Sequence, residues 1–267
     1  MQKEINLSKT NKLLLALLVG VGLAILFSNI IGKEVATIVT DILYVPASAA
    51  LLVLSAIATI IFKLKGDHGK AYLLFTCFVF MWFLAELIWT SSEIIHPASF
   101  PAYDDFVYLG GYPFLAAFMI YYLKPVRVAI TKLMMSYGLL ASSVFLVPTL
   151  YSMYIGNPNA GLDQIIWASI YPVSDAIVLF PAVLGLALFF RGQVSLLWSF
   201  GCIAIILNIA ADSGFFFLNV SKSYYTGSPI DMLYLWAYIL FAFGIYSHVK
   251  LYKRPKKKSY DDIEDLK

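Results

Sequence analysis

The sequence predicts an all-α, polytopic membrane protein with eight transmembrane helices. Of its 267 residues, 61% are hydrophobic and 13% are charged, whereas soluble domains are about half apolar and about a quarter charged. Eight stretches are apolar over the roughly 20 residues that a helix needs to cross a bilayer. This composition excludes a Rossmann enzyme, a β-sandwich and a nucleic-acid-binding domain.

The predicted spans are joined by short connections that carry proline and glycine, which commonly end helices. No long polar stretch divides the chain, so we predict one membrane domain made of two four-helix halves, residues 13–126 and 127–250. Residues 1–12 precede it, and a charged tail, 251–267, follows it. In order, the spans are 13–31, 42–62, 71–94, 106–123, 130–155, 165–190, 196–218 and 232–249.

The distribution of lysine and arginine predicts the orientation. On the eight-span map 17 of the 19 basic residues fall on the side that holds both termini, and the other side has Lys33 and Lys222. Basic residues concentrate in cytoplasmic loops, so we expect both termini in the cytoplasm and the protein in the cell membrane. The net charge of +3 therefore conceals a cytoplasmic side of +11 (17 basic, 6 acidic residues) and an outer side of −8 (2 basic, 10 acidic).

The two halves repeat their polar positions at a constant distance. A gapless shift of 126 residues matches four unusual positions of the first half to the second: Glu86 to Asp212, Asp105 to Asp231, Tyr108 to Tyr234 and Tyr112 to Tyr238. We therefore predict a parallel duplication of a four-helix unit. Such repeats occur in transporter folds without by themselves indicating transport.

Three aspartates, Asp41, Asp105 and Asp231, stand where inward-running spans are predicted to begin, each with a tyrosine three residues later. An aspartate there caps free backbone N–H groups and faces the positive end of the helix dipole. The tyrosine fits an interfacial aromatic belt. Helix capping is the expected role of these three, with ligand binding as the alternative.

Glu86, Asp175 and Asp212 lie inside predicted spans. Glu86 and Asp175 are each 16 residues from the nearest cytoplasmic basic residue of their span, about 24 Å along a helix. Asp212 lies 21 residues beyond Arg191 and is expected nearer the outer surface. Ionisable groups at membrane depth usually face a partner or a cavity.

No lysine or arginine is expected at that depth, so two interpretations remain. Either the acids are protonated and bonded to tyrosines such as Tyr108, Tyr171 or Tyr234, or they face a pocket that holds water or a cation. A cation between carboxylates and aromatic rings is chemically sensible. The candidate ligand- or cation-binding residues are Glu86, Asp105, Asp175, Asp212, Asp231, Tyr108 and Tyr234.

No catalytic residue or cofactor is predicted. Three scattered histidines are too few for a bis-histidine haem or a copper site, and no lysine lies within a span to hold retinal. No nucleotide-binding or hydrolase motif is present. A metal held by two carboxylates is left open.

Several short motifs resemble those of a known class of membrane module. They are residues 97–113 (PASFPAYDDFVYLGGYP), Tyr171-Pro172-Val173-Ser174-Asp175, Ala211-Asp212 and Asp231-x-x-Tyr234-Leu235-x-x-Tyr238. Together, over about residues 70–250, they resemble the multi-helix membrane regions at the N-terminus of archaeal and bacterial histidine kinases and diguanylate cyclases. The resemblance implies a prokaryotic sensory or scaffolding module with no known ligand. An output domain is not expected after Lys250, so signalling would pass through a partner chain.

The leading hypothesis is a non-enzymatic integral membrane protein that binds a ligand or partner at its outward acidic and aromatic layer. It would act as a sensor-like module or as an accessory subunit of a membrane complex. Its expected partners are the lipid bilayer and a membrane or signalling protein, with no nucleic acid. The alternatives are a small cation transporter or channel and, third, a lipid-modifying enzyme using paired carboxylates.

Overall fold

The all-α prediction is confirmed for the residues that the structure describes. The structure is a computed structural model that describes residues 5–95, 102–156, 161–190 and 196–252. These residues form eight α-helices with no strand, and 92% of them are helical. Each of the eight helices is long and apolar enough to cross a bilayer, as a multi-pass membrane protein requires.

The helices follow the predicted spans in order. They are α1 (Ile5–Ile31), α2 (Lys33–Phe62), α3 (Gly66–Ile95), α4 (Tyr103–Leu123), α5 (Lys132–Gly156), α6 (Leu162–Phe190), α7 (Leu196–Val220) and α8 (Asp231–Tyr252), with a 3₁₀ turn (Lys124–Ala129) after α4. Residues 97–101 of the proline-containing motif, Arg191 and residues 253–267 of the predicted tail lie outside the described residues.

Helix α2 differs most from its predicted span. It begins at Lys33, directly after Gly32, instead of near residue 42. Gly32 has a φ of 154° and separates α2 from α1. Hydropathy excluded the first turns of α2 because they carry Lys33, Glu34 and Asp41, yet these side chains do not prevent a helix at the end of a bundle.

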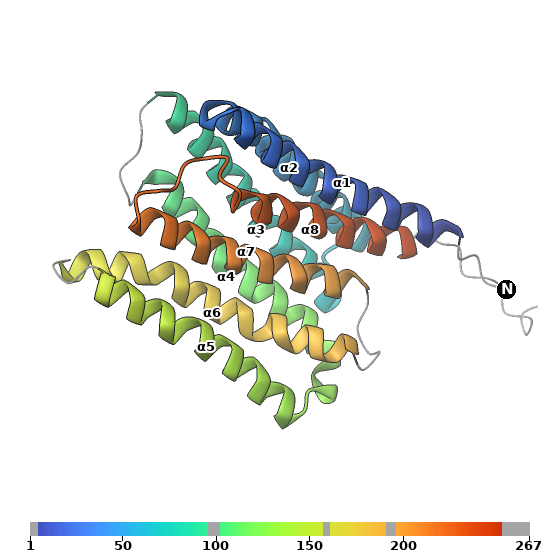
Figure 1. Cartoon of the computed structure of the whole chain (residues 1–267). Helices are drawn as coiled ribbons and strands as arrows, with labels where there is room; N and C mark the ends of the chain where they lie inside the picture. The colour runs from blue at the N-terminus through green and yellow to red at the C-terminus, as the bar shows by residue number, and fades with distance from the viewer. Residues whose placement is uncertain (1–4, 96–101, 157–160, 191–195, 253–267) are drawn as a thin grey trace, which may run out of the picture.

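The helices alternate in direction (Figure 1). Helices α2, α4, α6 and α8 begin at one end, which we call the acidic end and which holds Glu34, Glu93, Asp105 and Asp231. They end at the basic end, which holds Lys63, Lys65, Lys70, Lys124, Arg127, Lys132 and Lys250. The two ends therefore differ in charge as the sequence predicts.

Six helices form a closed ring. Each packs against the next in the order α2, α3, α4, α6, α7, α8 and back to α2. Helix α1 lies outside against α2 and α8, and α5 lies outside against α6 on the opposite side of the bundle (Figure 1). The interior of the ring is therefore shielded from lipid along most of its height.

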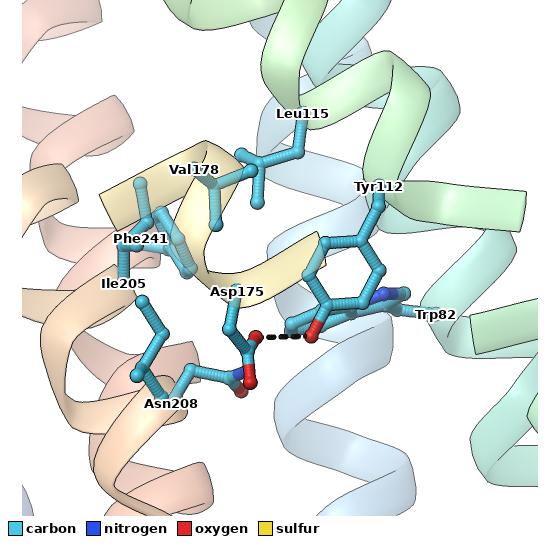
Figure 2. Close-up of a pocket in the computed structure, with 9 residues that line it drawn as sticks. Trp82, Tyr112, Leu115, Asp175, Val178, Ile205, Asn208 and Phe241 are labelled. Atoms are coloured by element: carbon cyan, nitrogen blue, oxygen red, sulfur yellow. Dashed lines mark hydrogen bonds between the residues drawn. The ribbon is translucent and has the colours of Figure 1, made fainter. Parts of the chain in front are cut away.

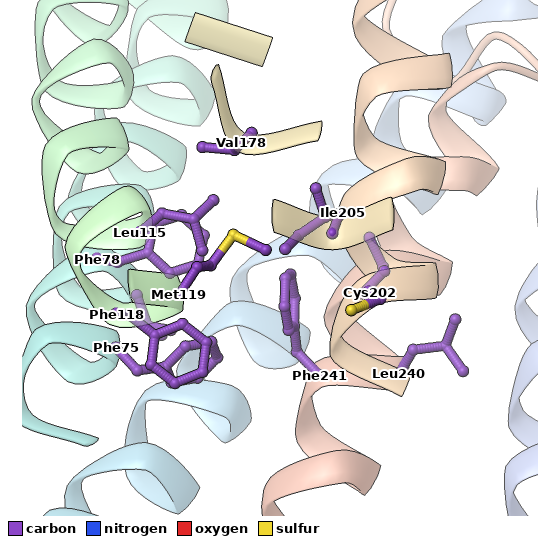
Figure 3. Close-up of a cluster of buried hydrophobic side chains, with 14 of the residues drawn as sticks. Phe75, Phe78, Leu115, Phe118, Met119, Val178, Cys202, Ile205, Leu240 and Phe241 are labelled. Atoms are coloured by element: carbon purple, nitrogen blue, oxygen red, sulfur yellow. The ribbon is translucent and has the colours of Figure 1, made fainter. Parts of the chain in front are cut away.

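Apolar side chains fill the half of the ring nearer the basic end. The ring centroid of Phe75 lies 4.9 Å from that of Phe118 and 5.4 Å from that of Phe241. Figure 3 shows these rings and Met119 of α4 facing Ile205 of α7. This packing contributes mainly dispersion energy, because the apolar side chains have an equally apolar solvent in lipid. Polar side chains occupy the other half.

The α7–α8 loop, residues 221–230, folds over the acidic end and contacts α1 and α2. The Asn29 side-chain amide donates to the Gly227 carbonyl at 2.7 Å, and the Thr37 hydroxyl donates to the Thr226 carbonyl at 2.7 Å. These bonds join helices from the beginning of the chain to a loop near its end.

Candidate functional site

The centre of the polar half is a pair of aspartates that share one tyrosine. The Tyr112 hydroxyl of α4 lies 2.6 Å from Asp175 Oδ1 of α6 and 3.3 Å from Asp212 Oδ2 of α7. Asp212 also accepts from Asn208 Nδ2 at 3.0 Å and from the Tyr234 hydroxyl at 2.7 Å. Figure 2 shows Tyr112 and Asn208 pointing toward Asp175.

The carboxyl of Asp212 lies close to that of Asp175, since one hydroxyl reaches both, although the sequence places Asp212 nearer the outer surface. The sequence argument counted from Arg191, but α7 begins at Leu196, which is 16 residues before Asp212. Asp212 is therefore as far along its helix as Glu86 and Asp175 were expected to be along theirs.

Two carboxyl groups this close cannot both ionise without compensation. Asp175 is 1% exposed, and the hydroxyl of Tyr112 reaches both carboxyls at once. The contacts around them come from tyrosines and an asparagine, with no lysine or arginine among these partners. Like charges in a medium of low dielectric repel strongly, so the pair must share a proton or hold a cation.

A cavity of about 10 Å³ adjoins Asp175. Its polar lining is Trp82, Tyr112, Asp175 and Asn208, and its apolar lining is Leu115, Val178, Ile205, Ile209 and Phe241. A space of this size holds about one water molecule. The site therefore accommodates a proton, a water or a small bare cation, and a larger ligand would require the helices to separate.

Glu86 is the second buried acid in this layer. It is 5% exposed, and its Oε1 accepts from the Tyr238 hydroxyl of α8 at 2.6 Å. The Tyr108 hydroxyl of α4 interacts with the same carboxyl. The Glu86 carboxyl therefore interacts with one tyrosine from each half of the chain.

The shift of 126 residues that relates the two halves also maps the tyrosine–acid contacts onto one another. The contact of Tyr112 with Asp212 becomes that of Tyr238 with Glu86, and both join one half of the chain to the other. The contact of Tyr108 with Glu86 becomes that of Tyr234 with Asp212, each within one half.

Trp82 of α3 lies among these tyrosines. Its ring centroid is 6.2 Å from those of Tyr108, Tyr112 and Tyr238, in edge-on contact with each. Its indole N–H donates to the Tyr108 carbonyl at 3.3 Å. Trp82 is 5% exposed and thus packs between the Glu86 contacts and the Asp175–Asp212 pair.

Asp105 takes the capping role that the sequence predicts for it, whereas Asp231 bonds to the loop that precedes its helix. Asp105 Oδ2 accepts from the backbone N–H of Ala102 at 2.7 Å, and Asp231 Oδ2 accepts from that of Gly227 at 2.7 Å. Tyr171 donates to Asp105 Oδ1 at 2.8 Å, and Tyr224 lies 3.2 Å from Asp231 Oδ1. Asp105 therefore caps the start of α4, and Asp231 fastens the α7–α8 loop to the start of α8.

Tyr224 donates to Asp231 as a neutral phenol. Burial, with a smaller contribution from the charge of Asp231, raises the pKa of Tyr224 well above its usual value. The hydroxyl therefore keeps its proton and remains a donor to the Asp231 carboxyl.

Asp41 does not cap a helix, and that interpretation is wrong. Helix α2 begins at Lys33, so Asp41 lies more than two turns inside it, and its Oδ1 has no hydrogen-bond partner. Capping requires a free backbone N–H, which only the first turn of a helix provides.

The seven predicted site residues fall into three groups. Asp175, Asp212 and Tyr234 lie together, as do Glu86 and Tyr108, while Asp105 and Asp231 lie at the starts of their helices. The contacts also include four side chains outside that prediction: Trp82, Tyr112, Asn208 and Tyr238. The repeat marks Tyr112 and Tyr238, and Asn208 precedes Asp212 by one helical turn on the same face.

Among the described residues, no three His, Cys, Asp or Glu side chains converge in a way that could hold a metal ion. No protein-family model, curated protein or solved structure matches this chain.

Proposed function

We propose that this chain is a non-enzymatic protein of the cell membrane that binds a small cation, in the first place a proton, at the Asp175–Asp212 pair. The observation that carries the proposal is that Tyr112 serves both carboxyls at once, at 2.6 and 3.3 Å. Loss of the shared proton would place two adjacent negative charges in a medium of low dielectric. The pair can therefore exist in two charge states, with and without the shared proton.

Helices α4, α6, α7 and α8 would transmit this change. Tyr112, Asp175, Asp212 and Tyr234 each come from a different one of them, so a second charge at the pair would act on all four helices. A sensor-like module requires a local change in charge coupled to helix positions. The motif resemblance to membrane modules of signalling proteins agrees with this role, and a partner membrane or signalling protein would receive the signal.

We also propose that both termini are cytoplasmic and that the two halves are parallel repeats. The basic end supports the orientation, because it is where α2, α4 and α8 end and where most described lysines lie. The exchange of tyrosine–acid contacts under the shift of 126 residues supports the repeat. Corresponding helices also pack alike, since α4 contacts α6 as α8 contacts α2.

Infrared difference spectroscopy on the purified protein tests the proposed site. The carbonyl band of a protonated carboxyl is expected to change with pH in the wild type and to lose that component in Asp175→Asn and in Asp212→Asn. The matched control is Asp67→Asn, because Asp67 lies in the first turn of α3 at the basic end, in an ion pair of 3.0 Å with Lys124. Identical spectra for the two site variants and the wild type would refute proton sharing at the pair.

A cation transporter or channel is the second candidate. A second cavity of about 10 Å³ lies next to the first toward the basic end, and the two share Ile205 and Phe241 as lining residues. The second cavity is otherwise lined by apolar side chains, such as Phe118 and Cys202. The two cavities would be two positions along one conduction path. Ile205 and Phe241, which lie between them, would form an apolar gate.

Proton flux into proteoliposomes tests this candidate. Ile205→Ala is expected to raise flux at least about tenfold, because it removes part of the wall between the cavities, and adding Asp212→Asn is expected to abolish the gain. Ile203→Ala serves as the control, since Ile203 is 39% exposed on the outside of the same helix. If Ile205→Ala conducts no more than Ile203→Ala, the path is not a conduction route.

A further inference from the structure

Unpaired buried oxygens gather at the acidic end, away from the Asp175–Asp212 pair. Seven buried side-chain N or O atoms among the described residues have no hydrogen-bond partner. Five of them lie on the facing ends of α2 and α3 or in the α7–α8 loop: Thr40 Oγ1, Asp41 Oδ1, Thr90 Oγ1, Glu93 Oε2 and Ser228 Oγ. Each such atom costs about 1–3 kcal/mol unless something binds it.

Two of the five belong to neighbouring carboxyl groups. Asp41 of α2 lies one turn after Thr37 on the same face of the helix, and it interacts electrostatically with Glu93 of α3. The other oxygen of Glu93, Oε1, accepts from the Thr226 hydroxyl, and Thr226 is itself joined to α2 through Thr37. Two facing carboxylates repel unless a proton or a cation lies between them.

Thr40 points toward the same region. Ala36, Thr40 and Tyr44 are buried at successive four-residue steps, so their side chains lie on one face of α2. On that face the backbone of Ala36 lies against Gly227, and the Tyr44 hydroxyl reaches the Asp231 carbonyl at 3.3 Å. Thr40 therefore lies between them, against residues 227–231, fully buried and with its hydroxyl unpaired.

Asp231 is not available as a further ligand. Its Oδ2 is occupied by the Gly227 backbone N–H, and its Oδ1 lies beside the Tyr224 hydroxyl. Asp231 nevertheless interacts electrostatically with Asp41 and Glu93. The facing parts of α2, α3 and the α7–α8 loop thus carry two unpaired carboxylate oxygens, three unpaired hydroxyl oxygens and a third carboxyl group.

We propose that Asp41, Glu93, Thr40, Thr90 and Ser228 form a Ca²⁺ site at the acidic end, between α2, α3 and the α7–α8 loop. Ca²⁺ takes six to eight oxygen ligands in flexible geometry, and five oxygens completed by water suit it. The two carboxylates neutralise its charge. Mg²⁺ demands a stricter octahedron and keeps its water molecules, so it fits the mixed hydroxyl set less well.

Asp41 and Glu93 are only partly buried as residues, but their unpaired oxygens are covered, so an ion from the outer side would enter by displacing the α7–α8 loop. Bound Ca²⁺ would join α2 and α3 to the α7–α8 loop and thereby hold the loop over the acidic end. Its affinity is expected in the range of extracellular calcium modules, Kd about 10⁻⁴–10⁻³ M.

Titration of the purified full-length protein with CaCl₂ tests the site, after chelator treatment and with MgCl₂ at matched ionic strength. Calorimetry is expected to give a Kd in that range for Ca²⁺ and at least about tenfold weaker binding for Mg²⁺. Asp41→Asn and Glu93→Gln are each expected to weaken Ca²⁺ binding at least about tenfold. Asp67→Asn is the control, and Asp175→Asn is expected to bind Ca²⁺ normally, which separates this site from the proposed proton site.

Thr40→Val provides a variant of nearly unchanged shape. If Thr40 is a ligand, the variant has an unfolding midpoint without Ca²⁺ at or above that of the wild type, because an unpaired buried hydroxyl is removed. It then gains less stability from Ca²⁺ than the wild type does. The proposal is overturned if Ca²⁺ does not bind, if Mg²⁺ binds equally well, or if Asp41→Asn and Glu93→Gln bind Ca²⁺ as the wild type does.

Discussion

Trp82→Ala is expected to lower the free energy of unfolding by about 3–5 kcal/mol, the usual cost of deleting a large aromatic side chain from a core. Trp82 is 5% exposed and packs edge-on against three tyrosines and against Phe78, at a centroid distance of 4.5 Å. It also lies so close to α4 that a Cβ on Gly111 would come within 2.8 Å of its indole ring. No neighbouring side chain can fill the space that the indole leaves without moving α3 toward α4.

Unfolding in mixed micelles, followed by circular dichroism, measures this loss. Trp82→Phe keeps most of the ring packing and removes only the N–H bond to Tyr108, so its cost is expected to be about 1 kcal/mol. Trp167→Ala is a matched control, because Trp167 is only partly buried and its ring contacts Phe106 on one side. If Trp82→Ala and Trp167→Ala are equally stable, Trp82 does not hold the polar layer together.

Gly227→Ala is expected to lower the free energy of unfolding by about 3 kcal/mol. Gly227 has a φ of 89°, which costs an L-residue about 1–2 kcal/mol. A Cβ there would also lie 2.4 Å from the backbone C and O atoms of Ala36, and overpacking against backbone costs about 1–3 kcal/mol more. The α7–α8 loop would have to move away from α2 to accept the methyl group.

Gly20→Ala is the control for this change. A Cβ on Gly20 meets nothing within 4 Å, and Gly20 lies inside α1, so alanine is expected to be neutral or to stabilise by about 0.5–1 kcal/mol. The same micelle titration, together with proteolysis of the α7–α8 loop, reports both effects. A Gly227→Ala protein with wild-type stability and an intact loop would contradict the close contact between the loop and α2.

The two positions act on different parts of the polar half. Trp82 supports the buried acids from within the ring, whereas Gly227 allows the α7–α8 loop to reach α2 and donates its backbone N–H to Asp231. We therefore expect Trp82→Ala to disturb the infrared signal of the Asp175–Asp212 pair. Gly227→Ala is expected to leave that signal in place.

Local sequence features were sufficient to predict the helices and the role of Asp105. Runs of apolar residues located all eight helices, because a spanning helix requires about 20 of them whatever its neighbours are. Asp105 was predicted correctly as a cap because capping depends on residues within a few positions along the chain, whereas Asp231 was predicted as a cap and bonds instead to the loop residue Gly227. Asp41 was wrongly assigned as a cap because hydropathy placed the start of α2 near residue 42, whereas the helix begins at Lys33.

The sequence by itself determined that this protein is helical, apolar enough for a bilayer and acidic at one end, since composition and periodicity depend only on the order of residues. The tertiary structure decided which acids meet. Asp175 and Asp212 are 37 residues apart and share Tyr112, which lies 63 residues from one and 100 from the other. Only the closing of six helices into a ring brings these groups within hydrogen-bonding distance, because that packing depends on side-chain contacts between helices that no local pattern in the chain records.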